Sequence, residues 1–275
     1  MGNGIAHVFA LAHFKVFLFD ISPPALAKAS NEIQKNLLRQ VDKGIISEQE
    51  SKLAFSKIHF SPNWKESDHY TQLVIEAVSE NISLKQKLFR EFDSHFSENT
   101  IFASNTSAIS ITSLASVVSF PERFIGLHFM NPVPVMRLVE IIKAHQTSPS
   151  TIQTSMELVK CLNKTPVFSE DFPGFLSNRM LMPLINEAIY AFHEGVGDVE
   201  SIDQVMKLGM GHPMGPLQLA DFIGLDICLS IMNVLYEGFK NPKYAPCPLL
   251  VKMVNAGDLG KKSGKGFYNY SSGVN

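Results

Sequence analysis

One histidine and one glutamate of this sequence have the surroundings that general acid–base chemistry needs. His128 lies near the end of the apolar run Gly-Leu-His-Phe, and Glu140 lies within Leu-Val-Glu-Ile-Ile. Both runs predict buried strands, and the twelve positions from His128 to Glu140 suffice for strand, turn and strand. We therefore expect the Glu140 carboxylate beside the His128 imidazole, where it would hold the ring and stabilise its charged form. Such a histidine can take a proton from a hydroxyl group, although a purely structural buried pair is the alternative.

An acidic residue near the amino terminus has the spacing of a ribose-binding acid. The segment from Gly2 to Phe14 predicts a helix, residues 15–19 predict a strand, and Asp20 follows directly. Dinucleotide-binding units place an acid about 20 residues beyond a glycine-rich turn, and the pyrophosphate at the amino end of the first helix. On this register Gly2 is the third fingerprint glycine and Asp20 accepts the ribose hydroxyls. The first strand and the first two glycines of the unit are then missing.

Other interpretations of the same segment are open. Gly2 and Gly4, separated by Asn3, could be read as the first two glycines of the fingerprint. His7 would then stand in place of the third glycine, and no strand precedes the motif. Asp20 could be a simple turn or helix-capping acid after a strand. The apolar run 5–12 could suggest a signal peptide, but it lacks preceding basic residues, and Ala6 stands where a myristoylation motif has Ser or Thr.

The elements that would position these residues are those of an α/β domain followed by helices. Short apolar runs recur near 58 and at 72–78, 100–104, 123–129 and 136–142, and helical stretches lie between several of them, at 23–43, 47–56, 84–96 and 149–162. After residues 167–171 the pattern becomes helical, with further helices at 199–208, 217–238 and 247–256. We expect an N-terminally truncated, Rossmann-like doubly wound sheet in residues 1–171, a hinge near 169–173, and an all-helical C-terminal domain in 172–275.

Composition excludes several classes of protein. The 24 basic and 26 acidic residues give a formal charge of −2, so the chain has no general electrostatic reason to bind nucleic acid or an anionic membrane. No apolar run is long enough for a membrane span. The three cysteines are an odd number without metal-site spacing, and five methionines between 180 and 214 suit a core or an acyl pocket better than a metal. We expect no metal and a reducing compartment, the cytoplasm.

Five segments together resemble one enzyme family. They are SNTS at 104–107, GLHFMNPVPVMRLVEII at 126–142, DFPGFLSNRMLMP at 171–183, GHPMGPLQLADFIGLD at 211–226 and GKKSGKGFYNY at 260–270. In order and spacing they are similar to the 3-hydroxyacyl-CoA dehydrogenases, most of all the short-chain bacterial type that acts on 3-hydroxybutyryl-CoA. The resemblance covers nearly the whole chain.

The resemblance implies an oxidoreductase that interconverts (S)-3-hydroxyacyl-CoA and 3-oxoacyl-CoA in fatty-acid or butanoate metabolism, including β-oxidation. NAD is the implied cofactor, and NADP fits less well because of Asp20. A homodimer through the helical domain is also implied. Two alternatives stay open: an inactive or weakly active acyl-CoA-binding or structural protein, because the fingerprint is truncated, and another β-hydroxyacid dehydrogenase, which would use a lysine as its base.

The resemblance also assigns roles to individual residues. It implies His128 as the base with Glu140 as its partner, Ser107 as a donor to the substrate hydroxyl, and Asn178 as the group that orients the acyl chain. The implied cofactor contacts beside Gly2 and Asp20 are Glu80, Lys85, Ser107, Asn131 and Lys262, and the implied coenzyme A contacts are Asn36, Lys43 and Ser107. By propensity alone, Ser107 could cap a helix starting near Ile109, Asn178 could cap or brace the first helix of the second domain, and Lys43 could be a solvated cation at a helix end.

Overall fold

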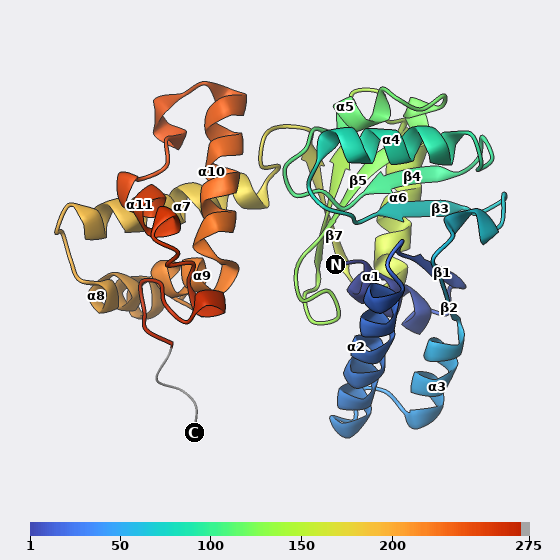
Figure 1. The fold of residues 1–275 in the computed structure, drawn as a ribbon, viewed down its shortest axis with the longest axis horizontal. Helices are drawn as coiled ribbons and strands as arrows, with labels where there is room; N and C mark the ends of the chain where they lie inside the picture. Colours follow the sequence, from blue (N-terminus) through green and yellow to red (C-terminus); the bar gives the residue numbers. More distant parts are fainter. Residues whose placement is uncertain (271–275) are drawn as a thin grey trace. The chain divides into compact units, whose positions relative to one another are not determined.

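The computed structural model describes residues 1–270 and divides the chain into two compact units, Met1–Asp171 and Phe172–Asn275. Figure 1 shows both strands and helices in the first unit and helices in the second. Each unit is described by itself.

The first unit alternates helices and strands. Its helices are α1 (Gly2–Leu11), α2 (Pro23–Asp42), α3 (Glu48–Ser56), α4 (Ile82–Asp93), α5 (Ile111–Ala115) and α6 (Pro149–Cys161). Its strands are β1 (Val16–Phe19), β2 (Ile58–Ser61), β3 (Leu73–Glu76), β4 (Ile101–Ser104), β5 (Phe124–Phe129), β6 (Leu138–Lys143) and β7 (Thr165–Glu170). The expected α/β alternation is confirmed, and most predicted segments end within two or three residues of the observed ones.

The strands form two separate sheets. β1 pairs in parallel with β2, and a second sheet has the order β3-β4-β5-β6-β7, in which only the β5–β6 pair is antiparallel. The break lies between β1 and β3. Among the described residues, no strand joins these two sheets.

Helices cover both faces of the larger sheet, as the doubly wound class requires. On one face, Ile5 and Phe9 of α1 and Val159 of α6 pack with Ile125 and Leu127 of β5. On the other face lie α4 and α5, as Figure 1 shows. A cluster of aromatic rings from α4, β4 and β5 fills the space beneath α4; it consists of Phe89, Phe92, Phe102 and Phe124. Apolar runs without polar alternation are what a sheet buried on two sides needs.

The amino-terminal helix packs closely on the loop that follows β5. A Cβ atom placed on Gly4 would lie 2.9 Å from the Val133 Cβ, so only glycine allows this approach. The same Cβ on Gly2 would meet Leu18 and Ala77 at 3.9 Å, which is ordinary contact. Packing therefore requires a glycine at position 4 but not at position 2.

The second unit is helical. It contains α7 (Ser177–His193), α8 (Val199–Gln204), a turn of π-helix (Val205–Gly209), α9 (Pro216–Ile223), α10 (Leu225–Phe239) and α11 (Pro248–Asn255). Its core joins α7, α9, α10 and α11 through residues such as Met182, Ile189, Leu217, Met232 and Leu250. The expected all-helical domain is confirmed.

One predicted helix of this unit is wrong. The apolar pattern over 217–238 predicts a single helix, but α9 ends at Ile223 and α10 begins at Leu225, with a bend of 98° between them. Gly224 makes the bend at a φ of 104°, which side chains other than glycine rarely allow. No single helix among residues 1–270 has the length and apolarity to cross a membrane, and only this bent pair would meet both criteria together.

Two buried aspartates organise the end of the second unit. Asp203 accepts hydrogen bonds from the Leu217 and Gln218 amides at the start of α9, at 2.8 and 2.9 Å. Asp221 accepts from the Phe267 and Tyr268 amides at 3.0 and 2.9 Å. Burial raises the pKa of the Asp221 carboxyl, and the hydrogen bonds that it accepts oppose this shift only in part. These carboxylates attach the segment of residues 260–270 to α8 and α9.

Candidate active site

The histidine and glutamate singled out in the sequence lie side by side. His128 of β5 and Glu140 of β6 are register partners in the antiparallel pair, and His128 Nδ1 lies 2.7 Å from Glu140 Oε2. Both residues are buried, and the Glu140 side chain is only 1% exposed. A buried carboxylate at this distance orients the ring and stabilises its positive charge, so the Nε2 atom is the one that would exchange a proton with a substrate.

Strand alternation determines which face carries this pair. Ile125, Leu127 and Phe129 of β5 pack in the core with α1 and α6, so Gly126 and His128 point to the opposite face. A Cβ on Gly126 would lie 2.8 Å from the Ile142 Cβ and 2.9 Å from Ile111 Cδ1. The glycine thus lets α5 approach the sheet directly beside the His128–Glu140 pair.

The loop after β4 is attached next to His128. The Asn105 side chain accepts a hydrogen bond from the Phe129 amide at 2.9 Å, which joins the ends of β4 and β5. Ser107 follows two residues later and is partly exposed. Asn105 is a residue that the sequence analysis missed, although it stands within the SNTS segment.

Ser107 does not cap a helix. The helix α5 begins at Ile111 rather than near Ile109, and Ser110 is its cap, accepting from the Ser113 amide at 3.2 Å. The Asp171 carboxylate also accepts from the Ile111 and Thr112 amides. The capping interpretation of Ser107 is therefore wrong, because two other side chains serve the start of this helix.

Two predicted cofactor residues meet Ser107 through a charged network. Glu80 Oε1 accepts from the Ser107 amide at 3.0 Å, and Glu80 Oε2 lies 3.2 Å from Lys85 Nζ. Lys85, in the first turn of α4, is 1% exposed, and its ammonium also contacts Glu76 Oε1 at 2.7 Å. The structure thus brings Glu80, Lys85 and Ser107 together, and it adds Glu76, which the sequence analysis did not consider.

The amino end of α1 lies close to the ends of two strands. Gly2 is the first residue of α1 and lies near Leu18 of β1 and Ala77 just after β3, so these two strands end on either side of it. Asp20 follows β1, is exposed, and accepts a hydrogen bond from the Ser22 amide at 2.9 Å. A helix amino terminus suits a pyrophosphate and an exposed carboxylate suits ribose hydroxyls, so this donor set fits NAD.

The predicted coenzyme A residues lie on the long helix α2. Asn36 and Lys43 are two turns apart and therefore share one side of the helix axis. Lys43 is exposed at the carboxyl end of α2, and Asn36 accepts a hydrogen bond from Arg39 at 3.2 Å. The exposure of Lys43 agrees equally with a solvated helix-end cation.

Asn131 stands in a loop that a buried lysine holds. It is exposed and follows β5 by two residues. Lys164 Nζ donates to the Val133 and Met136 carbonyls at 2.6 Å, and burial lowers the pKa of this ammonium. Lys164 is a third residue that the sequence analysis missed.

The remaining predicted residues belong to the second unit. Asn178 is the second residue of α7 and is buried, while Leu176 holds the cap position without a side-chain hydrogen bond. Asn178 thus lies inside the helix rather than at its cap position. Lys262 is exposed, and its ammonium lies 2.6 Å from Asp226 Oδ2.

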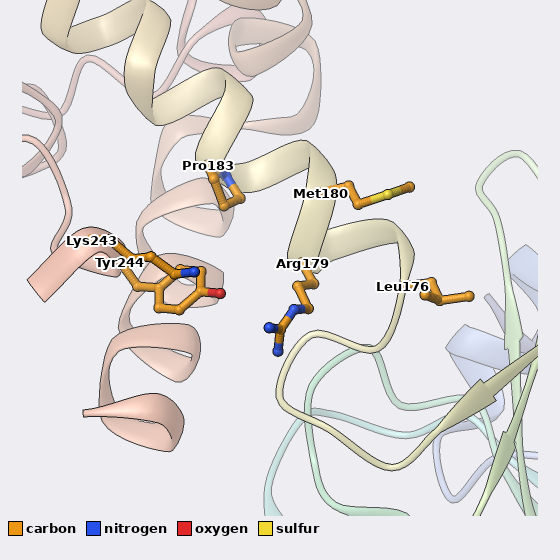
Figure 2. A pocket seen from close by; sticks show the side chains of 6 residues that line it. All are labelled: Leu176, Arg179, Met180, Pro183, Lys243 and Tyr244. Carbon is orange, nitrogen blue, oxygen red and sulfur yellow. The ribbon is translucent and has the colours of Figure 1, made fainter. Parts of the chain in front are cut away.

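A pocket of about 460 Å³ opens in the second unit, and Leu176, Arg179, Met180, Pro183, Lys243 and Tyr244 line it. In Figure 2 Arg179 and Lys243 lie on opposite sides of this space. The Arg179 guanidinium is 4.2 Å from the centre of the Phe239 ring, a cation–π distance. None of the predicted site residues lines this pocket.

Within residues 1–270, no group of three or more His, Cys, Asp or Glu side chains could hold a metal ion.

Comparisons with known proteins identify the family. Residues 1–172 match the model of the 3-hydroxyacyl-CoA dehydrogenase NAD binding domain, and residues 174–270 match that of the family's C-terminal domain. The chain is 52% identical to a probable 3-hydroxybutyryl-CoA dehydrogenase of Bacillus subtilis over 98% of this chain and 94% of that protein. It is 53% identical to 3-hydroxybutyryl-CoA dehydrogenase of Bradyrhizobium diazoefficiens over 98% of this chain and 92% of that protein.

A solved structure shows the same fold. The crystal structure of (S)-3-hydroxybutyryl-CoA dehydrogenase from Ralstonia eutropha superposes with a TM-score of 0.96 at 47% identity, covering 99% of this chain and 96% of that one. These matches support an oxidoreductase over a binding or structural protein. The chain therefore belongs to the 3-hydroxyacyl-CoA dehydrogenase family and is an NAD-dependent oxidoreductase.

Proposed function

We propose that this protein interconverts (S)-3-hydroxybutyryl-CoA and acetoacetyl-CoA, with His128 as the general acid–base. The observation that carries the proposal is the buried His128–Glu140 pair, with Nδ1 and Oε2 2.7 Å apart. The relatives named as 3-hydroxybutyryl-CoA dehydrogenases support a short acyl chain.

The chemistry of the pair follows from its geometry. Oxidation of a secondary alcohol removes a hydride from carbon and a proton from oxygen. NAD, when bound, supplies the hydride acceptor. His128 Nε2 takes the hydroxyl proton, and Glu140 stabilises the imidazolium that results, since its carboxylate is buried beside Nδ1. Ser107, in the loop attached beside β5, donates a hydrogen bond to the reacting oxygen, and Asn178 of the helical unit orients the acyl chain.

The cofactor would be held along the edge where β1, β3 and β4 end. The amino end of α1 at Gly2 would receive the pyrophosphate, and the Asp20 carboxylate would accept the ribose hydroxyls, which disfavours the 2′-phosphate of NADP. Glu80, Lys85, Ser107 and Asn131 would lie on the nicotinamide side, together with Lys262 of the second unit. Coenzyme A would lie along Asn36 and Lys43, where the exposed lysine offers the positive charge that a phosphate needs.

Assembly as a homodimer through the helical unit is part of the proposal. Val205, Leu208 and Met210, in and just after the π-helical turn, are 58%, 83% and 64% exposed. Apolar side chains so exposed within six residues are typical of a surface that another subunit covers.

The three cysteines, free in the structure, agree with action in a reducing compartment, the cytoplasm.

A direct assay tests the proposed reaction. Purified protein, NADH and acetoacetyl-CoA should give NADH oxidation that depends on both the protein and the thioester. The same assay with NADPH should be slower, because Asp20 would face the 2′-phosphate. Turnover of a free 3-oxo acid but not of the thioester would indicate the rival β-hydroxyacid dehydrogenase. Binding of acetoacetyl-CoA without any turnover would indicate a binding protein.

A further inference from the structure

Glu76 is a buried carboxylate that has no role in the site as described so far. It is the last residue of β3 and is 4% exposed. We infer that Glu76 is a positioning residue that acts through Lys85 to hold Glu80 and the loop of residues 105–109 in place. The inference rests on the proposed function only in placing Glu80, Lys85 and Ser107 beside the cofactor.

The carboxylate of Glu76 connects three elements. Its Oε1 accepts hydrogen bonds from Lys85 Nζ of α4 at 2.7 Å and from the Val78 amide at 2.6 Å. Its Oε2 accepts from the Ser104 hydroxyl of β4 at 2.6 Å. With donors on both oxygens and almost no exposure, the carboxylate is fixed in a single orientation.

Lys85 depends on Glu76 for its place. Its side chain is 1% exposed, and an ammonium buried this far is strongly disfavoured unless a carboxylate accompanies it. Glu76 is its fully buried partner at 2.7 Å, whereas Glu80 is 40% exposed and lies at 3.2 Å. Glu76 thus provides the fixed end of the network and Glu80 the end that reaches the surface.

Glu80 in turn organises the loop that carries Ser107. Its Oε1 accepts from the Thr106 hydroxyl and from the amides of Ser107 and Ala108, at 3.0 and 3.2 Å for the two amides. An exposed glutamate is usually mobile, and here the ion pair of Oε2 with Lys85 restrains it. The order of support therefore runs from Glu76 through Lys85 and Glu80 to the backbone at Ser107.

The test measures the loop itself, in protein without cofactor. In Glu76→Gln, the amides of Ser107 and Ala108 should exchange with deuterium roughly tenfold faster, while the amides of β5 keep their wild-type rates. The dissociation constant of NADH should rise with a smaller change in kcat, because the loop is misplaced but the His128–Glu140 pair is intact.

A matched control removes another buried charge. Asp203→Asn, like Glu76→Gln, neutralises a buried carboxylate. Asp203 accepts hydrogen bonds from two backbone amides, but it lies in the helical unit. This variant should speed exchange at Leu217 and Gln218 and leave Ser107 and Ala108 unchanged. If Glu76→Gln lowers the unfolding temperature but leaves exchange at Ser107 and Ala108 at the wild-type rate, the inference is overturned.

A second variant tests the same inference if Glu76→Gln alone does not fold. Glu76→Gln combined with Lys85→Met removes both buried charges together, so no unpaired ion is left in the interior. It should still show fast exchange at Ser107 and Ala108, because Glu80 has lost its cation. Wild-type protection of these two amides in the double variant would overturn the inference. Neither outcome depends on catalytic turnover, so failure of the proposed reaction would be seen separately.

Discussion

His128 and Glu140 face each other across the one antiparallel strand pair of the five-stranded sheet, and a single hydrogen-bond distance of 2.7 Å joins imidazole and carboxylate. The neighbours of His128 in β5 and of Glu140 in β6 are apolar, so each of the two polar side chains has the other as a partner of complementary charge and geometry. The reversal of strand direction at this point is what places residues 128 and 140 in register.

Replacement of the base tests the central residue. His128→Gln should lower kcat by roughly a hundredfold or more, because glutamine cannot accept the hydroxyl proton. His145→Gln is the control, since His145 is an exposed histidine of the same unit. The measurement is NADH oxidation with acetoacetyl-CoA, alongside thermal unfolding. Near-normal turnover of the His128 variant would remove this residue from the mechanism.

Neutralising the partner tests whether the pair works as a unit. Glu140→Gln keeps the size of the side chain but cannot stabilise an imidazolium, so kcat should fall roughly a hundredfold. The double variant with His128→Gln should be scarcely slower than His128→Gln alone, since the glutamate acts through the ring. Glu170→Gln at the exposed end of β7 is the control. Additive losses in the double variant would contradict a shared role.

Much of this site could be predicted from the sequence, because its strands are short, uninterrupted apolar runs in which a polar residue stands out. An apolar run with a single polar residue predicts both a buried strand and an unusual residue within it. His128 and Glu140 could be predicted as partners because the twelve positions between them suffice for strand, turn and strand. Asp20 could be singled out as a candidate ribose-binding residue because it follows a predicted strand directly. The fold class follows from the same runs.

The residues that the sequence did not reveal depend on contacts between distant segments. Glu76 looks like a polar end to an apolar strand. Of its three donors the Val78 amide is local, and only the approach of α4 and β4 brings the other two, Lys85 and Ser104. The break at Gly224 is hidden because apolar periodicity continues across it, although the glycine itself was a possible signal.

A buried histidine of α1 predicts acid sensitivity. His7 is 1% exposed, and burial lowers the pKa of its imidazole from the ordinary 6.5, although the neighbouring Gln40 side chain opposes part of this shift. The unfolded chain then binds a proton that the folded chain resists, so this contribution to stability is present above about pH 6.5 and is lost as the pH falls below it.

Chemical denaturation at a series of pH values measures this effect. His7→Leu should show a smaller loss in the free energy of unfolding than wild type between about pH 7 and pH 5, because it lacks the group that titrates. His59→Gln, at an exposed position of β2, should keep the wild-type slope. An unchanged slope in the His7 variant would assign the acid sensitivity to other groups.

The close approach of α5 to the sheet predicts a costly small substitution. Gly126→Ala places a methyl group 2.8 Å from the Ile142 Cβ and 2.9 Å from Ile111, so we expect a loss of about 1–3 kcal/mol in unfolding free energy. Because Gly126 and His128 share a strand face, kcat should fall as well. Gly197→Ala, whose added methyl group would lie 3.6 Å or more from its neighbours, should be close to neutral in stability and is the comparison. Equal stability of the two variants would show that β5 can move aside without cost.

The proposed dimer makes the exposed π-helical turn an interface. Leu208 is 83% exposed, and Leu208→Glu should weaken self-association at least about tenfold, because a charge would be buried without a partner. Ile21→Glu is matched in exposure, also 83%, but lies in the first unit, so it should leave self-association unchanged. Sedimentation equilibrium over a range of concentrations measures both constants. A monomeric wild type, or a Leu208 variant that associates as wild type does, would place the subunit contact elsewhere or remove it.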